Sequence, residues 1–303
     1  MKLRIGSRGS HLALTQTRWV AQQLIEKGFD VTIQEIKTTG DKILDVPLAK
    51  VGGKGLFVKE IEEALLEGQI DLAVHSMKDM PTKCPSGTMI GAVPKRADPR
   101  DALISRDGMT LDNLPFGSKI GTSSLRRQAQ LKRVRPDFIF LPVRGNLSTR
   151  MRKLSEGEVD ALILAVAGLY RIGWQDRITE YIPFDICLPA IGQGALAIEC
   201  RENDPVVLNQ IAFLNDPETA CEIETERALL TRLEGGCQTP IAGFAKKDGG
   251  IIQLEGLVAN LDGSEIIREK KSAPIGQETA LGIDLAESLL RRGADLILKG
   301  LSL

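Results

Sequence analysis

The sequence predicts a mixed α/β protein with two similar α/β domains and a third, small α+β domain. Three observations support this prediction. Short apolar strands alternate with amphipathic helices in the first part of the chain, which is typical of a mostly parallel sheet covered by helices. The same order of elements recurs further along. The pattern then changes near Glu218, where a long helix is followed by strands and a final helix.

Hydrophobic periodicity places the elements of the first domain. Alternating or continuous apolar residues predict strands over residues 3–6, 31–36 and 70–74. Apolar residues at helical spacing predict helices over 11–26 and 55–67. Strands separated by helices in this way indicate parallel pairing.

A weak but ordered repeat predicts the second domain. In three places a later segment repeats the pattern of an earlier one: residues 2–8 and 118–124, residues 31–36 and 138–143, and residues 67–74 and 156–163. Pro94 and Pro99, among charged residues, suggest the boundary near Pro94–Asp101.

The remaining elements complete the expected domain plan. The strand after Gly192 is a candidate to return to the first domain, as in two-lobed α/β binding proteins. A helix over 218–233, strands over 251–258 and 265–270, and a helix over 279–292 form the small domain. We expect domains over residues 1–96 plus about 194–214, over 97–193, and over 215–303.

Composition excludes several classes of protein. The 39 Lys and Arg residues balance 40 Asp and Glu residues, which argues against a protein that coats nucleic acid. No apolar run is long enough to cross a bilayer, and the first residues do not resemble a signal peptide. Five widely spaced cysteines without a CxxC pair favour reduced thiols and a cytoplasmic location. Two histidines make a histidine-rich metal site improbable, so we expect no metal.

Two turns of small residues suggest anion binding. Gly6–Ser10 and Gly121–Ser124 each follow a strand and precede a helix, where backbone N–H groups and the helix dipole favour an anion. Ordinary helix capping is the alternative. Arg126 and Arg127 follow the second turn, and arginine binds carboxylates through paired hydrogen bonds. The alternatives there are a solvated helix face, which we expect for Arg133 and Arg135, or a nucleic-acid patch.

Two further segments carry reactive side chains. Lys78 and Asp79 directly follow a buried strand, the position where α/β sheets place ligands, although Asp79 also fits a turn cap before Pro81. Cys237 lies between two glycines and Pro240, in a loop typical of an accessible thiol. The alternative for Cys237 is an inert buried cysteine.

Taken together, these segments closely resemble the porphobilinogen deaminase family over essentially the whole chain. The matching motifs are Ile5–Arg8 with Leu12–Leu14, Lys50–Glu60, Val74–Asp79, Gly121–Arg127, Arg144–Asn146, Leu188–Gly194 and Leu233–Gln238. The resemblance implies three domains, the first two like a type 2 periplasmic-binding fold. It also implies a dipyrromethane cofactor on the cysteine matching Cys237, head-to-tail addition of four porphobilinogen molecules with loss of ammonia, and hydrolytic release of hydroxymethylbilane.

The resemblance also implies residue roles. Asp79 takes the position of the catalytic aspartate. Expected cofactor-binding residues are Cys237 through a thioether, Lys78, Asp79, Thr122, Ser123, Ser124, Arg126, Arg127, Arg144 and Gly145. Expected substrate-binding residues are Arg8, Ser10, Lys54, Phe57, Arg144, Arg150 and Gln193.

Other expectations concern partners and alternatives. We expect a cytoplasmic monomer whose partner is porphobilinogen, without nucleic acid or membrane, and a moving loop near residues 46–56. The competing hypotheses are a two-lobed carboxylate sensor and a nucleic-acid-binding protein. The sensor explains the repeat and the arginines but not the Cys237 loop or the third domain. The nucleic-acid hypothesis predicts strongly salt-dependent affinity.

Overall fold

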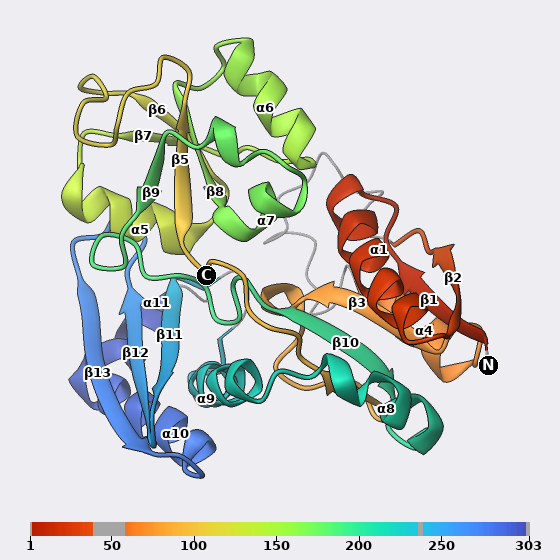
Figure 1. Ribbon diagram of the computed structural model, residues 1–303. Helices are drawn as coiled ribbons and strands as arrows, with labels where there is room; N and C mark the ends of the chain where they lie inside the picture. The colour runs from red at the N-terminus through yellow and green to blue at the C-terminus, as the bar shows by residue number, and fades with distance from the viewer. Residues whose placement is uncertain (1, 39–57, 236–238, 301–303) are drawn as a thin grey trace. The chain divides into compact units, whose positions relative to one another are not determined.

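The computed structural model describes residues 2–38, 58–235 and 239–300. The chain divides into two compact units (Figure 1). Unit 1 comprises Met1–Ala97 and Ala195–Ala220, and unit 2 comprises Asp98–Gly194 and Cys221–Leu303. None of the described helices is long and apolar enough to cross a membrane.

Unit 1 contains a five-stranded sheet in the order β2-β1-β3-β10-β4. Its strands are β1 (Lys2–Ser7), β2 (Asp30–Glu35), β3 (Leu72–Ser76), β4 (Thr88–Ala92) and β10 (Leu196–Arg201). Its helices are α1 (His11–Glu26), α4 (Lys59–Leu66) and α8 (Pro205–Ile211), with short 3₁₀ turns η1 (Met77–Asp79) and η3 (Ala212–Leu214). β1 pairs in parallel with β2 and β3, whereas β10 pairs antiparallel with β3 and β4. The strand after Gly194 therefore joins the first sheet, as the sequence suggested.

Unit 2 contains a second five-stranded sheet in the order β7-β6-β8-β5-β9. Its strands are β5 (Asp101–Ser105), β6 (Lys119–Gly121), β7 (Ile139–Leu141), β8 (Ala161–Ala165) and β9 (Glu180–Ile182). Its helices are α5 (Leu125–Val134), α6 (Leu147–Ser155) and α7 (Val166–Arg171), with a 3₁₀ turn η2 (Gln175–Arg177). β6 pairs in parallel with β7 and β8, and β5 pairs antiparallel with β8 and β9.

The two sheets share one plan. In each, three parallel strands are extended by an antiparallel strand that the chain supplies as it passes from one unit to the other: β5 in unit 2 and β10 in unit 1. This reciprocal exchange is the arrangement of a type 2 periplasmic-binding fold. It confirms the predicted fold class and the repeat.

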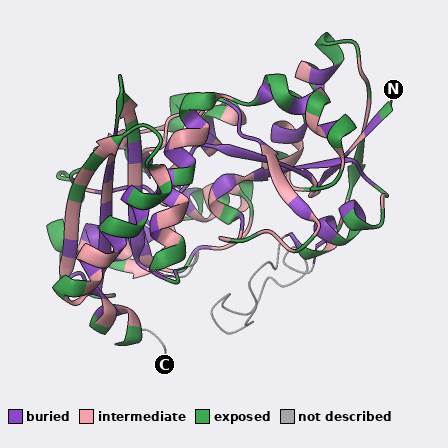
Figure 2. Ribbon diagram, turned by 90° about the horizontal axis from the view of Figure 1, so that it is seen from below, coloured by how far each residue is buried: buried purple, intermediate pink, exposed green. Residues whose placement is uncertain are grey.

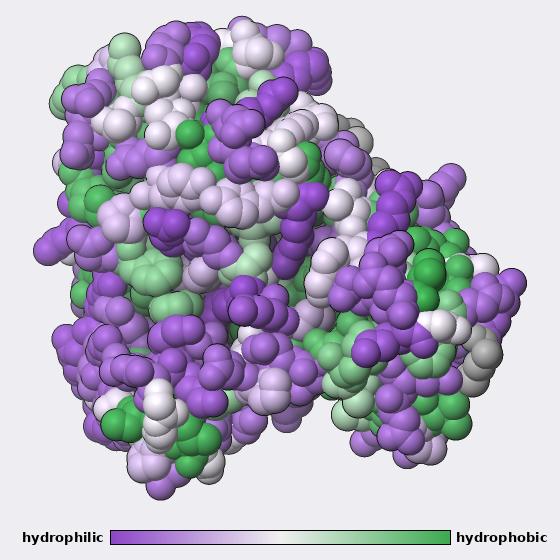
Figure 3. Space-filling model, in the orientation of Figure 1, coloured by the Kyte–Doolittle hydropathy of each residue, from purple (hydrophilic) through white to green (hydrophobic). Residues whose placement is uncertain are grey.

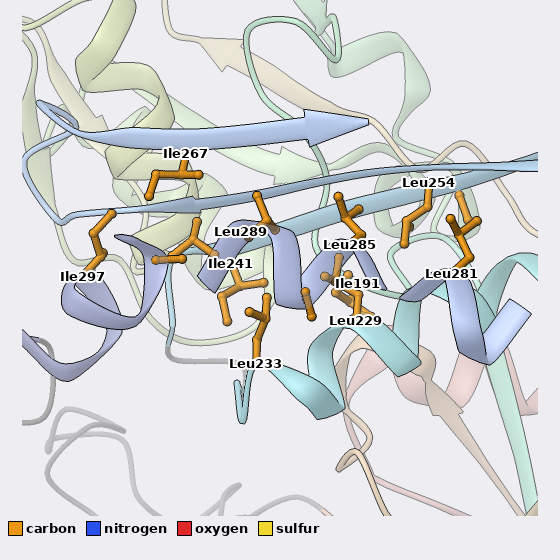
Figure 4. Packing of buried hydrophobic residues seen from close by; sticks show 14 of the residues in the cluster. Ile191, Leu229, Leu233, Ile241, Leu254, Ile267, Leu281, Leu285, Leu289 and Ile297 are labelled. Atoms are coloured by element: carbon orange, nitrogen blue, oxygen red, sulfur yellow. The ribbon is translucent and has the colours of Figure 1, made fainter. Parts of the chain in front are cut away.

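The C-terminal elements pack around their own core. They are α9 (Pro217–Arg232), β11 (Ile241–Asp248), β12 (Ile251–Ala259), β13 (Ile266–Pro274), α10 (Glu278–Leu289), the π-helical turn η4 (Leu290–Ala294) and α11 (Asp295–Gly300). Figure 4 shows leucines of α9 and α10 against isoleucines and a leucine of the antiparallel sheet β11-β12-β13. Apolar burial of this kind is the main source of stability for such a small sheet.

The sequence missed one strand of this sheet. Two strands were expected, but β11 makes a third, because Ile241, Ala242 and Ala245 are buried in a segment that otherwise resembles a loop. The expected final helix also ends early, at Leu289, and Gly293 with a φ of 104° bends the chain before α11. The proposed domain limits remain predictions, since the C-terminal elements fall in the same compact unit as the second sheet.

Buried residues gather in the sheets and on the inner sides of the helices (Figure 2). In the middle of the second sheet, strand β8 (Ala161–Ala165) is continuously apolar and almost wholly buried. This is the pattern expected for strands covered on both faces. The functional loops therefore extend from rigid elements.

Candidate functional site

In unit 1, the candidate residues lie at one edge of the sheet. β1 and β3 are parallel neighbours in the register Ile5↔Leu72 and Gly6↔Ala73. Their carboxyl ends therefore lie side by side. The loop with Arg8 and Ser10 follows β1, and the turn with Lys78 and Asp79 follows β3. Ligands of open α/β sheets bind at this edge.

Side chains of helix α1 form hydrogen bonds to the last residues of β1 and β3. Thr17 Oγ1 donates to Ser7 Oγ at 2.8 Å, and Gln16 Nε2 donates to Ser76 Oγ at 3.1 Å. The side chain of Ser10 accepts a hydrogen bond from Ala13 N at 3.3 Å and caps the helix. Ordinary capping is therefore confirmed for Ser10, and its contact with substrate remains a prediction.

Asp79 is exposed on a firmly anchored turn. The flanking Met77 and Met80 are 1% and 3% exposed and hold η1 against the sheet. Within the described residues, the Asp79 carboxylate has no hydrogen bond or ion pair, so it does not cap the turn before Pro81. Lys78 beside it is partly buried. The sheet thus presents a carboxylate that is fixed in place but open to a partner.

A buried polar network includes His75 of β3, the strand that precedes this turn, and no sequence motif predicts it. Glu199 of β10 bonds to His75 Nε2 at 2.9 Å and accepts from Thr88 Oγ1 at 2.7 Å. Glu62 of α4 is also buried, and its Oε1 has no partner among the described residues. Burial and the nearby Glu199 raise the pKa of Glu62 to about 7. These groups come from four separate elements, which is why no motif marks them.

In unit 2, three parallel strands end at the other candidate edge. The Thr122–Ser124 turn follows β6, and Arg144 follows β7. Thr122 N donates to Leu141 O at 3.0 Å, and Ser123 Oγ donates to Val143 O at 3.1 Å. Ser124 is the N-cap residue of α5, but its side chain makes no capping hydrogen bond. The first turn of α5 therefore differs from that of α1, where Ser10 supplies this bond.

The loop after β7 brings its backbone and arginines together. Asn146 caps α6 by accepting from Thr149 N at 2.9 Å, and Arg150 Nε donates to Gly145 O at 3.0 Å. Gly145 has a φ of 95°, and a Cβ there would lie 2.8 Å from Thr149 Cγ2. Only glycine fits this loop without strain. Arg144 and Arg150 are both partly buried.

The structure shows the surroundings of the arginines in and directly after α5, and of these Arg133 is exposed as expected. Arg126 and Arg127 are 4% and 6% exposed, so they do not form a solvated face. Both pair with the fully buried Asp101, at 2.8 Å and 2.7 Å. Arg135, expected at the surface, instead pairs with Asp137 and donates to the carbonyl oxygens of Leu111 and Leu114. Direct contact of Arg126 and Arg127 with the cofactor remains a prediction.

Gln193 belongs to the same buried cluster. It is fully buried, and its side-chain Nε2 donates to Pro99 O and to Asp101 Oδ1, both at 2.8 Å. The side chain ties the segment before β10 to the segment before β5. Contact of Gln193 with substrate remains a prediction.

Sequence reasoning missed one cation. Arg171, at the end of α7, is partly buried and donates through Nη2 to Gly194 O at 2.6 Å. Burial lowers the pKa of Arg171 to about 10, and no carboxylate among the described residues pairs with it. A cation in this setting favours an anionic ligand. Arg171 belongs to no small-residue turn or basic cluster, so no pattern in the sequence marks it.

Some expected site residues lie outside the described residues. These are Lys54, Phe57, Cys237 and the loop over 46–56. Their roles remain predictions.

Comparisons with known proteins bear on the whole chain. The family description "Porphobilinogen deaminase, dipyromethane cofactor binding domain" matches residues 3–209, and "Porphobilinogen deaminase, C-terminal domain" matches residues 220–291. The chain is 56% identical to the porphobilinogen deaminase of Geobacter sulfurreducens, over 98% of this chain and 94% of the relative. It is 54% identical to that of Syntrophotalea carbinolica, over 99% of this chain and 96% of the relative.

Among solved structures, a Salmonella typhimurium periplasmic binding protein with high arginine specificity covers 72% of this chain and 96% of its own. It aligns with a TM-score of 0.39 and 16% identity. The two family descriptions and the relatives cover nearly every residue. The chain belongs to the porphobilinogen deaminase family, the transferases of tetrapyrrole biosynthesis that polymerise porphobilinogen on a dipyrromethane cofactor.

Proposed function

We propose that Asp79 is the catalytic carboxylate of this hydroxymethylbilane synthase and that the unit 2 edge binds the carboxylates of the cofactor and the growing chain. One observation carries the first part: Asp79 is exposed and unpaired among the described residues, on a turn that buried methionines fix at the carboxyl edge of the sheet.

The substrate explains the need for cations. Each porphobilinogen carries an acetate and a propionate, so a chain of four added units is a polyanion. We assign carboxylate binding to Arg8, Lys54, Lys78, Arg144, Arg150 and Arg171, with neutral contacts from Ser10, Phe57, Thr122, Ser123, Ser124 and Gly145. Guanidinium groups suit this role because they form paired hydrogen bonds with carboxylates.

The described residues of unit 2 fit an anionic cofactor. The first turn of α5 lacks a side-chain cap, and Arg171 has no carboxylate partner among the described residues. Each feature favours an anion. The dipyrromethane, when bound through a thioether to Cys237, supplies the pyrrole end to which substrate is joined.

Asp79 has two roles in this proposal, to stabilise a positive charge and to accept a proton. Loss of ammonia from porphobilinogen leaves a cation, which a fixed carboxylate stabilises electrostatically. The same carboxylate accepts hydrogen bonds from pyrrole N–H groups and takes up a proton when the ring is restored. Lys78, its neighbour in the turn, contributes a positive charge for a substrate carboxylate.

We also propose that the protein is a cytoplasmic monomer that binds neither nucleic acid nor membrane. The balanced charge supports this proposal. On the face seen in Figure 3, hydrophobic side chains occur in small patches among hydrophilic ones. A stable subunit interface requires a larger continuous surface.

The mass of the denatured protein tests the cofactor and its anchor together. We expect an excess mass of two linked pyrroles, located by peptide mapping on the peptide that contains Cys237. Cys237→Ala should remove this mass, whereas Cys84→Ala, at a partly exposed cysteine of unit 1, should retain it. An adduct on another cysteine would refute the anchor. A chain that stays bare after incubation with porphobilinogen would refute the covalent cofactor.

A further inference from the structure

His75 lies at the end of β3 that leads into the turn of Lys78 and Asp79, and it forms a buried pair with Glu199 of β10. His75 is 6% exposed and Glu199 is 0% exposed. Glu199 Oε2 lies 2.9 Å from His75 Nε2, and Glu199 Oε1 accepts a hydrogen bond from Thr88 Oγ1 of β4 at 2.7 Å. One carboxyl group therefore joins side chains of the three neighbouring strands β3, β10 and β4.

The end of β3 is held from both faces of the sheet. Successive side chains of a strand point to opposite faces, so His75 and Ser76 leave β3 on opposite sides. Ser76 accepts a hydrogen bond from Gln16 of α1, and His75 bonds to Glu199 on the other side. The next residue, Met77, donates its backbone N–H to the carbonyl oxygen just before β10 at 3.0 Å. The turn that follows is thus aligned by a contact on each face and by one along the strand.

Glu62 of α4 adds a second carboxyl group to the cluster without disturbing the pair. Its Oε1 is buried and has no hydrogen-bond partner among the described residues. Burial, reinforced by Glu199 and Glu63, raises the pKa of Glu62 to about 7, whereas His75 acts in the opposite direction. When Glu62 carries its proton, it does not compete with Glu199 for His75.

We propose that Glu199 is a positioning residue for catalysis, which acts through His75 on the alignment of Asp79. Glu199 is fully buried and does not reach the open edge itself. The pair fixes the carboxyl end of β3, and because η1 follows directly, a loosened pair shifts the turn. A carboxylate that meets a charge developing in the transition state affects rate more than binding when it is displaced. This inference rests on the proposed role of Asp79 as the catalytic carboxylate.

Replacement of the carboxyl group by an amide tests the proposal. In Glu199→Gln the side chain keeps its size, but one acceptor oxygen becomes an N–H donor, which weakens the contacts with His75 and Thr88. Positioning predicts that kcat falls about tenfold, while KM changes by less than about twofold and the covalent cofactor is retained. Steady-state kinetics and the intact mass of the protein measure these quantities. An unchanged kcat, or a KM that rises as much as kcat falls, would overturn the proposal.

Asp71 offers a matched control at the other end of the same strand. It directly precedes β3, is 6% exposed, and accepts hydrogen bonds from Arg4 and Arg201. Asp71→Asn should lower thermal stability and leave kcat unchanged, because the amino end of β3 lies away from the turn. Equal losses of kcat in Asp71→Asn and Glu199→Gln would assign Glu199 a general structural role and would also overturn the proposal.

A double variant tests whether Glu199 acts through Asp79. If it does, Glu199→Gln added to Asp79→Asn should lower kcat no further, because no carboxylate is left to align. A further loss of about tenfold would mean that Glu199 acts independently of Asp79, contrary to the proposal. Asp79→Asn alone judges the proposed function: normal turnover there refutes the catalytic role. Lost turnover in Asp79→Asn with normal turnover in Glu199→Gln refutes only the positioning role.

Thr88 supplies a milder variant where Glu199→Gln does not fold. Thr88→Val removes the hydroxyl that donates to Glu199 Oε1 and should lower kcat about threefold. Thr88→Ser keeps the hydroxyl and should retain the natural kcat. If Thr88→Val turns over normally, or if Thr88→Ser loses as much kcat as Thr88→Val, this hydrogen bond has no part in the alignment and the proposal fails.

Discussion

The antiparallel strands β10 of unit 1 and β5 of unit 2 occupy equivalent places in their two sheets. Each carries a fully buried carboxylate, Glu199 in unit 1 and Asp101 in unit 2. Glu199 bonds to His75 and Thr88, with the protonatable Glu62 nearby. Asp101 bonds to two guanidinium groups and an amide. Two sheets of one plan thus bury an acid on equivalent strands by different means.

The difference indicates that the two buried acidic clusters respond differently to pH. Asp101 stays ionised at all moderate pH values, because its partners are permanent cations. The unit 1 network instead contains a carboxyl group that titrates near neutrality. The open edges also differ: among the candidate residues, unit 1 presents the carboxylate of Asp79 beside the cations Arg8 and Lys78, whereas unit 2 presents cations and an uncapped helix. The sequence repeat therefore conceals two distinct electrostatic environments.

The largest expected effect comes from removing the negative charge of Asp79 in unit 1. Asp79→Asn should keep the fold and the bound cofactor but lower kcat by about 10²–10⁴-fold, the usual range for a group that stabilises charge and moves protons. Steady-state kinetics with intact mass measurement would check this. Asp30→Asn, at the start of β2 and thus at the opposite edge, is the control. Normal turnover in Asp79→Asn would remove the proposed contrast between the edges.

A smaller effect is expected at the unit 2 edge. Gly145→Ala should destabilise unit 2 by about 1–3 kcal/mol, because alanine is strained at positive φ and its Cβ would meet Thr149. Gly173→Ala shares the positive φ, but nothing lies within 4 Å of the added Cβ, so it should cost less. Urea unfolding of both variants would measure the difference. Equal losses of unfolding free energy in the two variants would mean that the packing of Gly145 against Thr149 contributes nothing beyond the positive φ.

The smallest expected effect is the dependence of folding stability on pH. The pKa of Glu62 is about 7 in the folded protein, above the ordinary value of 4.5, so the folded protein keeps a proton that the unfolded chain has released. The stabilisation is complete below pH 4.5 and is lost as the pH rises through 7. Glu62→Gln should therefore gain thermal stability over the natural protein at pH 8 but not at pH 4.5.

Glu67→Gln, at an exposed position directly after the same helix, is the control. Parallel pH profiles of the natural protein and Glu62→Gln would contradict the buried titration. Asp101 contributes the opposite sign, since its lowered pKa confines any loss of stability to strong acid.

Much of the fold was predictable because local patterns determined it. Helix α1 spans His11–Glu26, as its apolar spacing predicted, and the repeated strand-turn-helix pattern matches the two equivalent sheets. β11 was missed because its burial depends on packing against α9 and α10 and not on its own residues. The positions of Asp79 and of the Thr122–Ser124 turn were likewise predictable, since both follow buried strands directly.

The partners of the charged residues were not predictable. A run of arginines in sequence looks alike whether it faces water, a ligand or a buried acid. Asp101 lies 25 positions from Arg126, and Glu199 lies 124 positions from His75. Arg171 donates a hydrogen bond to the carbonyl oxygen of Gly194, which only the folded chain brings near.

The sequence by itself determined the family, the α/β class, the two similar halves and the candidate residues Asp79 and Cys237, because these depend on short motifs and on periodicity. The tertiary structure decided which charges are satisfied within the protein and which remain for a ligand. Burial removes water from a charged group, so its state depends on the neighbours that folding brings to it. For this reason Arg126 and Arg127 pair with Asp101, and Asp79 remains exposed.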